Sequence, residues 1–185
     1  MPARKLAEVL AEDDRAIEML LYIAKQSADD PDFGAVKLQK IAFAADFGSY
    51  RRTGSSVSGQ QYRRLGMGPV MADFKRIFAY MNVRGWAYIK KHKVGNRTQD
   101  RLSASVRSPQ PKLLTDMDKK SIDDAIALLK GMNAGAVSAW SHQFPCWDYA
   151  SDKEAIPYAA SLLSNRSLTR AEYTYGHEAA LAAGL

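Results

Sequence analysis

The most reactive side chains of the sequence lie close together near residue 145. Cys146 is the only cysteine, His142 precedes it by four residues, and Asp148 follows it by two. A thiol, an imidazole and a carboxylate are the groups of a cysteine hydrolase, which also needs paired donors for the oxyanion. Pro145 interrupts the helix between the imidazole and the thiol, and such groups normally converge from separate elements of the fold. We therefore expect no catalytic residue, and we interpret His142 as a polar side chain that packs beside neighbouring tryptophans.

The other residues with binding chemistry form neither a metal site nor a phosphate-binding loop. His92, His142 and His177 are scattered relative to Cys146 and do not have the spacing of zinc ligands. The glycines of residues 66–69 precede a predicted helix, where backbone N–H groups can bind phosphate, but the Gly-Lys-Ser/Thr ending is missing. We expect a tight turn at this position, no metal and no cofactor.

Positive charge is concentrated in residues 84–112. The net charge of the chain is +6, and this segment alone contributes +7, from eight Lys and Arg residues minus Asp100. Trp86 and Tyr88 lie within it, so its cations and rings could bind nucleic acid through phosphates and stacked bases. The same charges suit an acidic protein partner, and both interpretations stay open.

The elements that position these residues are predicted to be mostly helices. Apolar residues recur at spacings of three, four and seven over most of the chain, and the period changes to that of strands only after Gly85. We predict a mainly α (α+β) fold, a single compact domain of five to six helices with a small antiparallel hairpin. The helices are expected at residues 4–28, 35–52, 69–84, from a cap at Thr115, at 134–142 and at 170–183, with hairpin strands at 86–89 and 102–106.

The domain is expected to cover residues 1–150, including the basic hairpin at 85–107. Residues 151–185 form a C-terminal tail that is expected to pack on the same domain. Neither an apolar signal segment nor an apolar stretch of membrane length occurs, and a single cysteine permits no intrachain disulfide. The sequence therefore predicts a cytoplasmic protein that does not contact membranes.

Three separated motifs resemble one known family. Residues 37–40 spell Lys-Leu-Gln-Lys at the start of a helix, where Lys37 opposes the helix dipole unless it meets a carboxylate or an inward polar contact. Residues 65–70 resemble the family's Tyr-Gly-Pro-Val turn, with Met67 in place of the usual aromatic, and residues 136–147 resemble its closing Ser-His, Pro, Trp signature. In this order, over residues 15–150, they resemble the SocA-like, or Panacea-domain, antitoxins. The motif positions are Lys37, Leu38, Gln39, Lys40, Gly68, Pro69, Val70, Ser141, His142, Pro145 and Trp147.

The resemblance implies a bacterial, phage-associated antitoxin that is not an enzyme. Such a protein neutralises a cognate toxin, encoded by a neighbouring gene, through direct contact, and in one branch of the family it delivers the toxin to the Clp protease. The alternative is a nucleic-acid-binding or regulatory protein of a mobile element that acts through residues 84–112. The candidate partner-binding residues are Tyr62, Arg63, Arg64, Trp86, Tyr88, Lys90, Lys91 and Lys93.

Overall fold

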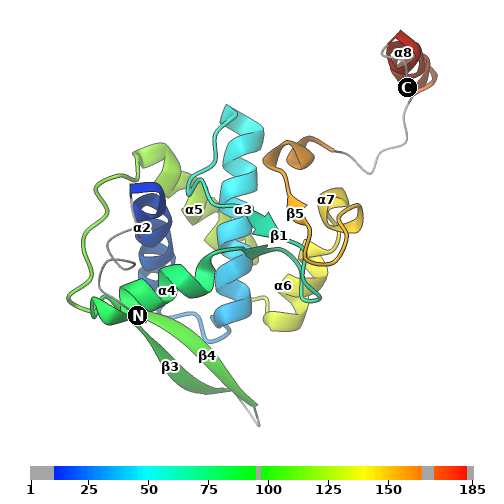
Figure 1. The fold of residues 1–185 in the computed structure, drawn as a ribbon. Coiled ribbons are helices and arrows are strands. Elements are labelled where there is room, and N and C mark those ends of the chain that lie inside the picture. The colour runs from blue at the N-terminus through cyan, green and yellow to red at the C-terminus, as the bar shows by residue number, and fades with distance from the viewer. Residues whose placement is uncertain (1–10, 95–96, 164–168, 183–185) are drawn as a thin grey trace.

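The computed structural model describes residues 11–94, 97–163 and 169–182. Its centre is the helix α3 (Ala35–Thr53), which lies between α2 (Ala11–Gln26), α5 (Asp116–Leu129) and α6 (Ala134–Ser141) (Figure 1). The helix predicted at residues 35–52 is therefore confirmed, and eleven of the nineteen residues of α3 are buried, as expected for a helix surrounded by others. The helix ends at Gly54, whose φ of 77° is a left-handed conformation that glycine adopts easily.

Reciprocal hydrogen bonds fix the start of α5. The Thr115 Oγ1 accepts a hydrogen bond from the Asp118 N–H (3.2 Å), and the Asp118 Oδ2 accepts one from the Thr115 N–H (2.9 Å). The same carboxylate accepts a hydrogen bond from Arg15 on α2 (3.0 Å), so the cap also holds α2 against α5. The predicted cap is therefore confirmed, and it has this second role.

A small sheet occupies positions where a helix was predicted to begin. The strand β1 (Tyr62–Arg63) pairs in antiparallel fashion with both β2 (Val70–Met71) and β5 (Ala155–Ile156). The helix α4 (Phe74–Val83) therefore begins five residues later than the predicted start at residue 69. Residues 70 and 71 are extended because their backbone pairs with β1, the strand just before them in the chain, a pairing that the spacing of the apolar residues after residue 69 does not report.

The predicted hairpin exists and is longer than expected. The strands β3 (Ala87–Val94) and β4 (Arg97–Ala104) are in register from Ala87↔Ala104 to Val94↔Arg97. At its base, Ala87 and Leu102 are buried in the core, and Gln99 of β4 donates a hydrogen bond to the Pro31 carbonyl oxygen after α2, while the far end of the strands projects away from the helices (Figure 1). The predicted turn residues 95–96 lie outside the described residues. Most of the basic segment thus forms one protruding arm.

The chain after α6 continues with short elements. Pro145, expected to interrupt the helix between His142 and Cys146, begins a new helix, α7 (Pro145–Asp148), a position that suits its fixed φ. The 3₁₀-helix η1 (Tyr158–Leu162) packs on α3. In Figure 1, α8 (Arg170–Ala182) stands apart from the other elements, and the domain boundary near residue 150 stays a prediction.

The described residues confirm the predicted fold class, mainly α with a small antiparallel β part. They form seven α-helices, of which α7 is a single turn. A membrane-spanning helix is not found among them, because none combines sufficient length with sufficient apolar character.

Candidate protein-binding surface and the motif cluster

The polar side chains at the start of α3 hold neighbouring loops against the helix. The Lys37 Nζ lies 2.6 Å from the Asp30 Oδ2 in the loop after α2. The Lys37 side chain in this ion pair is only 1% exposed. The Lys40 Nζ donates a hydrogen bond to the Pro69 carbonyl oxygen (2.8 Å), and the Gln39 Oε1 accepts one from an N–H group of β2 (2.9 Å). Burial lowers the pKa of Lys40 to about 8. The carboxylate and the inward polar contacts that the sequence left open are therefore both present.

The turn at residues 66–69 lies tightly between α3 and α6. Gly68 has a φ of +94°, and a Cβ atom at this position would lie 2.1 Å from the Ser141 Oγ and 2.8 Å from the Lys40 Cε. The Ser138 Oγ donates a hydrogen bond to the Met67 carbonyl oxygen (3.1 Å). This is the tight turn that the sequence predicted, and close approach of the backbone requires glycine there.

His142 packs flat against Trp147. Their ring centroids are 3.8 Å apart with an interplanar angle of 14°, and the Arg64 guanidinium lies 4.2 Å from the Trp147 ring centroid on α7. The Arg64 Nε also donates a hydrogen bond to the Trp147 carbonyl oxygen (3.0 Å). Burial, followed by the positive charges of Lys40 and Arg64, lowers the pKa of His142. The imidazole therefore stacks beside a tryptophan, as the sequence predicted.

Cys146 is buried in this part of the fold. Burial raises the pKa of its thiol to about 11, whereas an activated nucleophilic cysteine needs a lowered pKa. Within the described ranges, no group of three or more His, Cys, Asp or Glu side chains is placed to hold a metal ion.

The three motifs thus meet in one cluster, formed by the start of α3, the turn at 66–69 and the α6–α7 segment. A family model described as "Antitoxin SocA-like, Panacea domain" matches residues 38–148, which contain most of this cluster. The chain belongs to this family. No curated protein and no solved structure matches the chain. Membership in the SocA-like family supports an antitoxin-like role and suggests a toxin as the partner.

The eleven family-motif positions, which we call the motif cluster, are the scaffold of the SocA-like domain. None of them is exposed: Val70, His142 and Trp147 are half-buried, and the other eight are buried. A protein partner contacts surface side chains, so a binding surface has to lie elsewhere on the molecule.

Tyr62, a candidate partner-binding residue, is in the core. Its side chain is 0% exposed, and its hydroxyl donates a hydrogen bond to the Asp46 Oδ2 (2.8 Å). The Ser58 N–H (2.7 Å) and the Ser58 hydroxyl donate to the same carboxylate, whose burial raises the pKa of Asp46 to about 6. We therefore remove Tyr62 from the binding surface. No motif of the sequence marks Asp46; its one signal is its position among the apolar residues of α3, three residues after Phe43.

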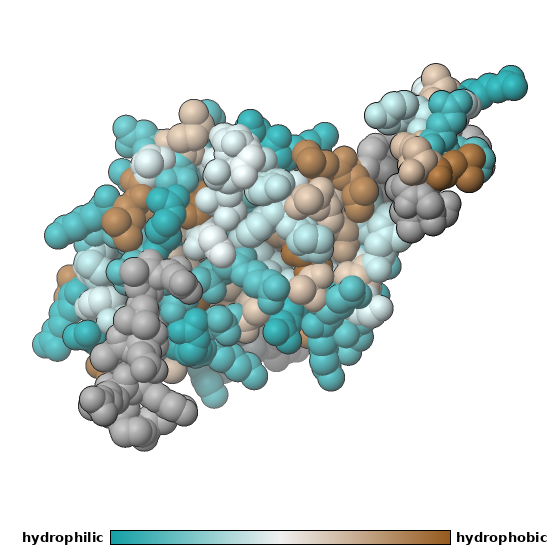
Figure 2. All heavy atoms as spheres, turned by 45° about the horizontal axis from the view of Figure 1, so that its top comes forward, coloured by the Kyte–Doolittle hydropathy of each residue, from teal (hydrophilic) through white to brown (hydrophobic). Residues whose placement is uncertain are grey.

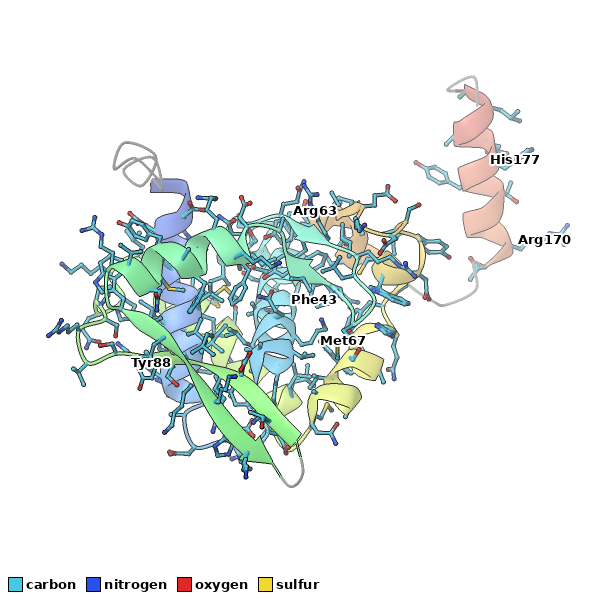
Figure 3. The ribbon with its side chains drawn as sticks, turned by 60° about the horizontal axis from the view of Figure 1, so that its bottom comes forward. Phe43, Arg63, Met67, Tyr88, Arg170 and His177 are labelled. Carbon is cyan, nitrogen blue, oxygen red and sulfur yellow. The ribbon has the colours of Figure 1, made fainter. Side chains whose placement is uncertain are left out.

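The remaining candidates do not form one surface. Arg63 is exposed on β1 and Arg64 stacks on Trp147, whereas Tyr88 lies on the hairpin, well apart from Arg63 and Met67 (Figure 3). The structure therefore separates the two arginines from the hairpin candidates.

The hairpin candidates are divided between base and arm. Trp86, at the base, is half-buried and packs edge-on against Tyr80, with ring centroids 5.7 Å apart. Tyr88 is 47% exposed and Ile89 is 39% exposed. We define the hairpin surface as the exposed residues Tyr88, Ile89, Lys90, Lys91 and Lys93.

The hairpin surface combines a few apolar side chains with several cations. On the face drawn in Figure 2, hydrophilic residues dominate and the hydrophobic ones form small separate areas. That face offers no broad apolar patch of the kind that obligate interfaces bury. An aromatic anchor with a charged rim is a recognised alternative for a protein interface.

Proposed function

We propose that this SocA-like chain neutralises a cognate toxin in the cytoplasm by direct contact through the hairpin surface. The observation that carries the proposal is the projecting β3–β4 arm, whose lysines and Tyr88 are exposed while every motif position is buried or half-buried. Neutralisation of this kind needs no reactive group. It needs an anchor that desolvates on binding, which Tyr88 supplies, and charges that select the partner, which the lysines supply.

The test is expression of the neighbouring gene, as the toxin, with and without this chain. We expect the triple variant Lys90→Glu/Lys91→Glu/Lys93→Glu to lose protection and to bind the toxin at least about 30-fold more weakly, because three rim charges reverse sign. Growth and isothermal titration calorimetry measure the two effects.

A matched variant controls for net charge. Lys75→Glu/Lys120→Glu/Lys130→Glu makes the same change at three exposed lysines outside the hairpin, and it should retain protection. The proposal fails if neither neighbouring gene is toxic, or if the hairpin variant, shown to be folded, protects as well as the control.

Masking and proteolysis are two routes to the same neutralisation. If the chain presents the toxin to the Clp protease, the toxin's half-life in cells should fall when the chain is present and recover when the protease gene is deleted. If the chain masks the toxin, the half-life should stay constant while toxicity disappears.

Nucleic acid binding remains the second hypothesis, supported by the exposed lysines of the same arm. It predicts binding to arbitrary duplex DNA that weakens steeply as salt concentration increases. If the hairpin triple variant still bound duplex DNA as the wild type does, a nucleic-acid role for the arm would be contradicted.

We also propose that the chain is not an enzyme. Replacing Cys146 with alanine should leave toxin protection unchanged in the growth assay, because the buried thiol with its raised pKa takes no chemical part. If a folded Cys146→Ala variant lost protection, with toxin binding retained, a catalytic role would have to be considered again.

A further inference from the structure

A groove of about 440 Å³ runs between the hairpin and the C-terminal end of α2. One wall comes from α2 and the loop that follows it, and the other comes from both strands of the hairpin. The groove is lined by Ala24, Lys25, Ala28, Phe33, Tyr88, Lys90, His92, Arg101, Leu102, Ser103 and Ala104.

The groove lies against one face of β3, whose Tyr88, Lys90 and His92 line it, while consecutive residues of β4 complete the lining. Side chains alternate between the faces of a strand, and residues paired across strands share a face. The pairs Tyr88↔Ser103 and Lys90↔Arg101 therefore lie on the groove face, and all four residues line the groove. Ile89, Lys91 and Lys93 alternate onto the opposite face.

The groove is positively charged and has no carboxylate among its lining residues. Lys25, Lys90 and Arg101 make no ion pair within the part of the chain that the structure describes. Arg101 donates hydrogen bonds to the carbonyl oxygens of Ala28 (3.4 Å) and Asp30, which leave its net charge in place. The Asp30 carboxylate is occupied by its ion pair with Lys37 inside the fold. The groove thus keeps a positive field directed at an incoming ligand.

The lining also has an apolar part. Ala24, Phe33 and Leu102 are buried behind the surface, so the apolar side chains exposed to a ligand are Ala28 and Tyr88. Apolar contacts surrounded by cations suit a protein segment, whose side chains alternate between apolar and charged. Single-stranded nucleic acid favours several stacking rings along its path, and this groove has one exposed ring, Tyr88.

We propose that this groove binds an acidic, extended segment of the toxin, with Tyr88 as its anchor and Lys25, Lys90 and Arg101 as its charge partners. The proposal rests on the proposed function, which requires only that the hairpin contacts the toxin. It adds the face of the hairpin that makes the contact, the participation of α2, and the charge of the bound segment.

Two double variants with the same change in charge distinguish the groove face of the hairpin from the opposite face. Lys25→Glu/Lys90→Glu reverses two charges in the groove, and we expect it to weaken toxin binding at least about 30-fold. Lys91→Glu/Lys93→Glu reverses two charges on the opposite face. We expect it to weaken toxin binding about threefold or less, because it changes only the long-range electrostatic field. Equal losses would overturn the groove while leaving hairpin-dependent binding intact. Full binding by the triple hairpin variant would instead overturn the proposed function.

Photo-crosslinking identifies what occupies the groove. The photoreactive residue benzoylphenylalanine replaces Tyr88 in one protein and Ile89 in another, each co-expressed with the toxin, and mass spectrometry locates the crosslinks. We expect position 88 to crosslink efficiently to a toxin segment of net negative charge and position 89 to crosslink at least about fivefold less. A neutral or basic segment at position 88, or a short single-stranded DNA that displaces the toxin from the groove, would contradict the proposal.

Discussion

Replacing Gly68 with alanine should lower the free energy of unfolding by about 3 kcal/mol. The φ of +94° strains any residue with a Cβ atom, and that atom would lie 2.1 Å from the Ser141 Oγ. It would also lie 2.8 Å from the Lys40 Cε, so both α3 and α6 would have to move. Urea denaturation measured by circular dichroism gives the difference between the variant and the wild type.

Two other glycines distinguish the cost of a positive φ from the cost of a steric clash at the added Cβ atom. Gly54 also has a positive φ (77°), with nothing near its missing Cβ, so Gly54→Ala should cost only about 1 kcal/mol. Gly66 has neither a positive φ nor a neighbour within 4 Å, and Gly66→Ala should change stability by less than about 0.5 kcal/mol. If Gly68→Ala were no more harmful than Gly54→Ala, the turn would not be clamped between the two helices. A partial recovery in Gly68→Ala/Ser141→Ala would identify the serine as one of the clashing groups.

Replacing Asp46 with alanine should destabilise the fold by about 3 kcal/mol at pH 5. The Asp46 carboxyl group accepts hydrogen bonds from the Ser58 N–H, the Ser58 hydroxyl and the Tyr62 hydroxyl, and truncation would leave these buried donors without an acceptor. Asp46→Asn has the same shape and keeps an acceptor oxygen, so we expect a loss of about 1 kcal/mol. Equal losses for the two variants would show that the hydrogen bonds are not what holds this region together.

The raised pKa of Asp46 adds a pH dependence with a definite sign. The folded protein keeps the proton up to about pH 6, whereas the unfolded chain releases it near the ordinary aspartate pKa of 3.8. The stabilising contribution of the protonated form is therefore fully present below pH 3.8 and is lost as pH rises through 6. Relative to Asp46→Asn, the wild type should lose about 3 kcal/mol of stability between pH 4 and pH 7, from a shift of about two pKa units. If the stability of the wild type relative to Asp46→Asn stayed constant or increased with pH, this assignment would be contradicted.

Gly68 and Asp46 also test the division between scaffold and surface. Neither residue lines the groove or belongs to the hairpin surface. Their variants should therefore lower the melting temperature while the folded molecules still bind toxin with wild-type affinity. The hairpin variants should do the reverse, with little change in stability and a large change in affinity.

The sequence by itself determined the features that depend on near neighbours. The periodic apolar residues of α3 required a buried central helix, Thr115 required a cap, and the cations of residues 84–112 lay between turns that define a hairpin. Three motifs in order were enough to identify the family. In each case the interacting residues are within a few positions of one another, or the pattern itself is the signal.

Only the tertiary structure decided which side chains meet across the fold. The Lys40 Nζ bonds to Pro69, 29 residues away, and the Tyr62 hydroxyl reaches Asp46, 16 residues away, so a tyrosine that looked like a surface anchor is in the core. The strands β1, β2 and β5 are two residues long and exist only because their partners lie beside them. The register of β3 with β4, and the packing of α2 beside that hairpin, decide which lysines face the groove. These contacts depend on the packing of distant segments, which charge, periodicity and motif spacing along the chain do not encode locally.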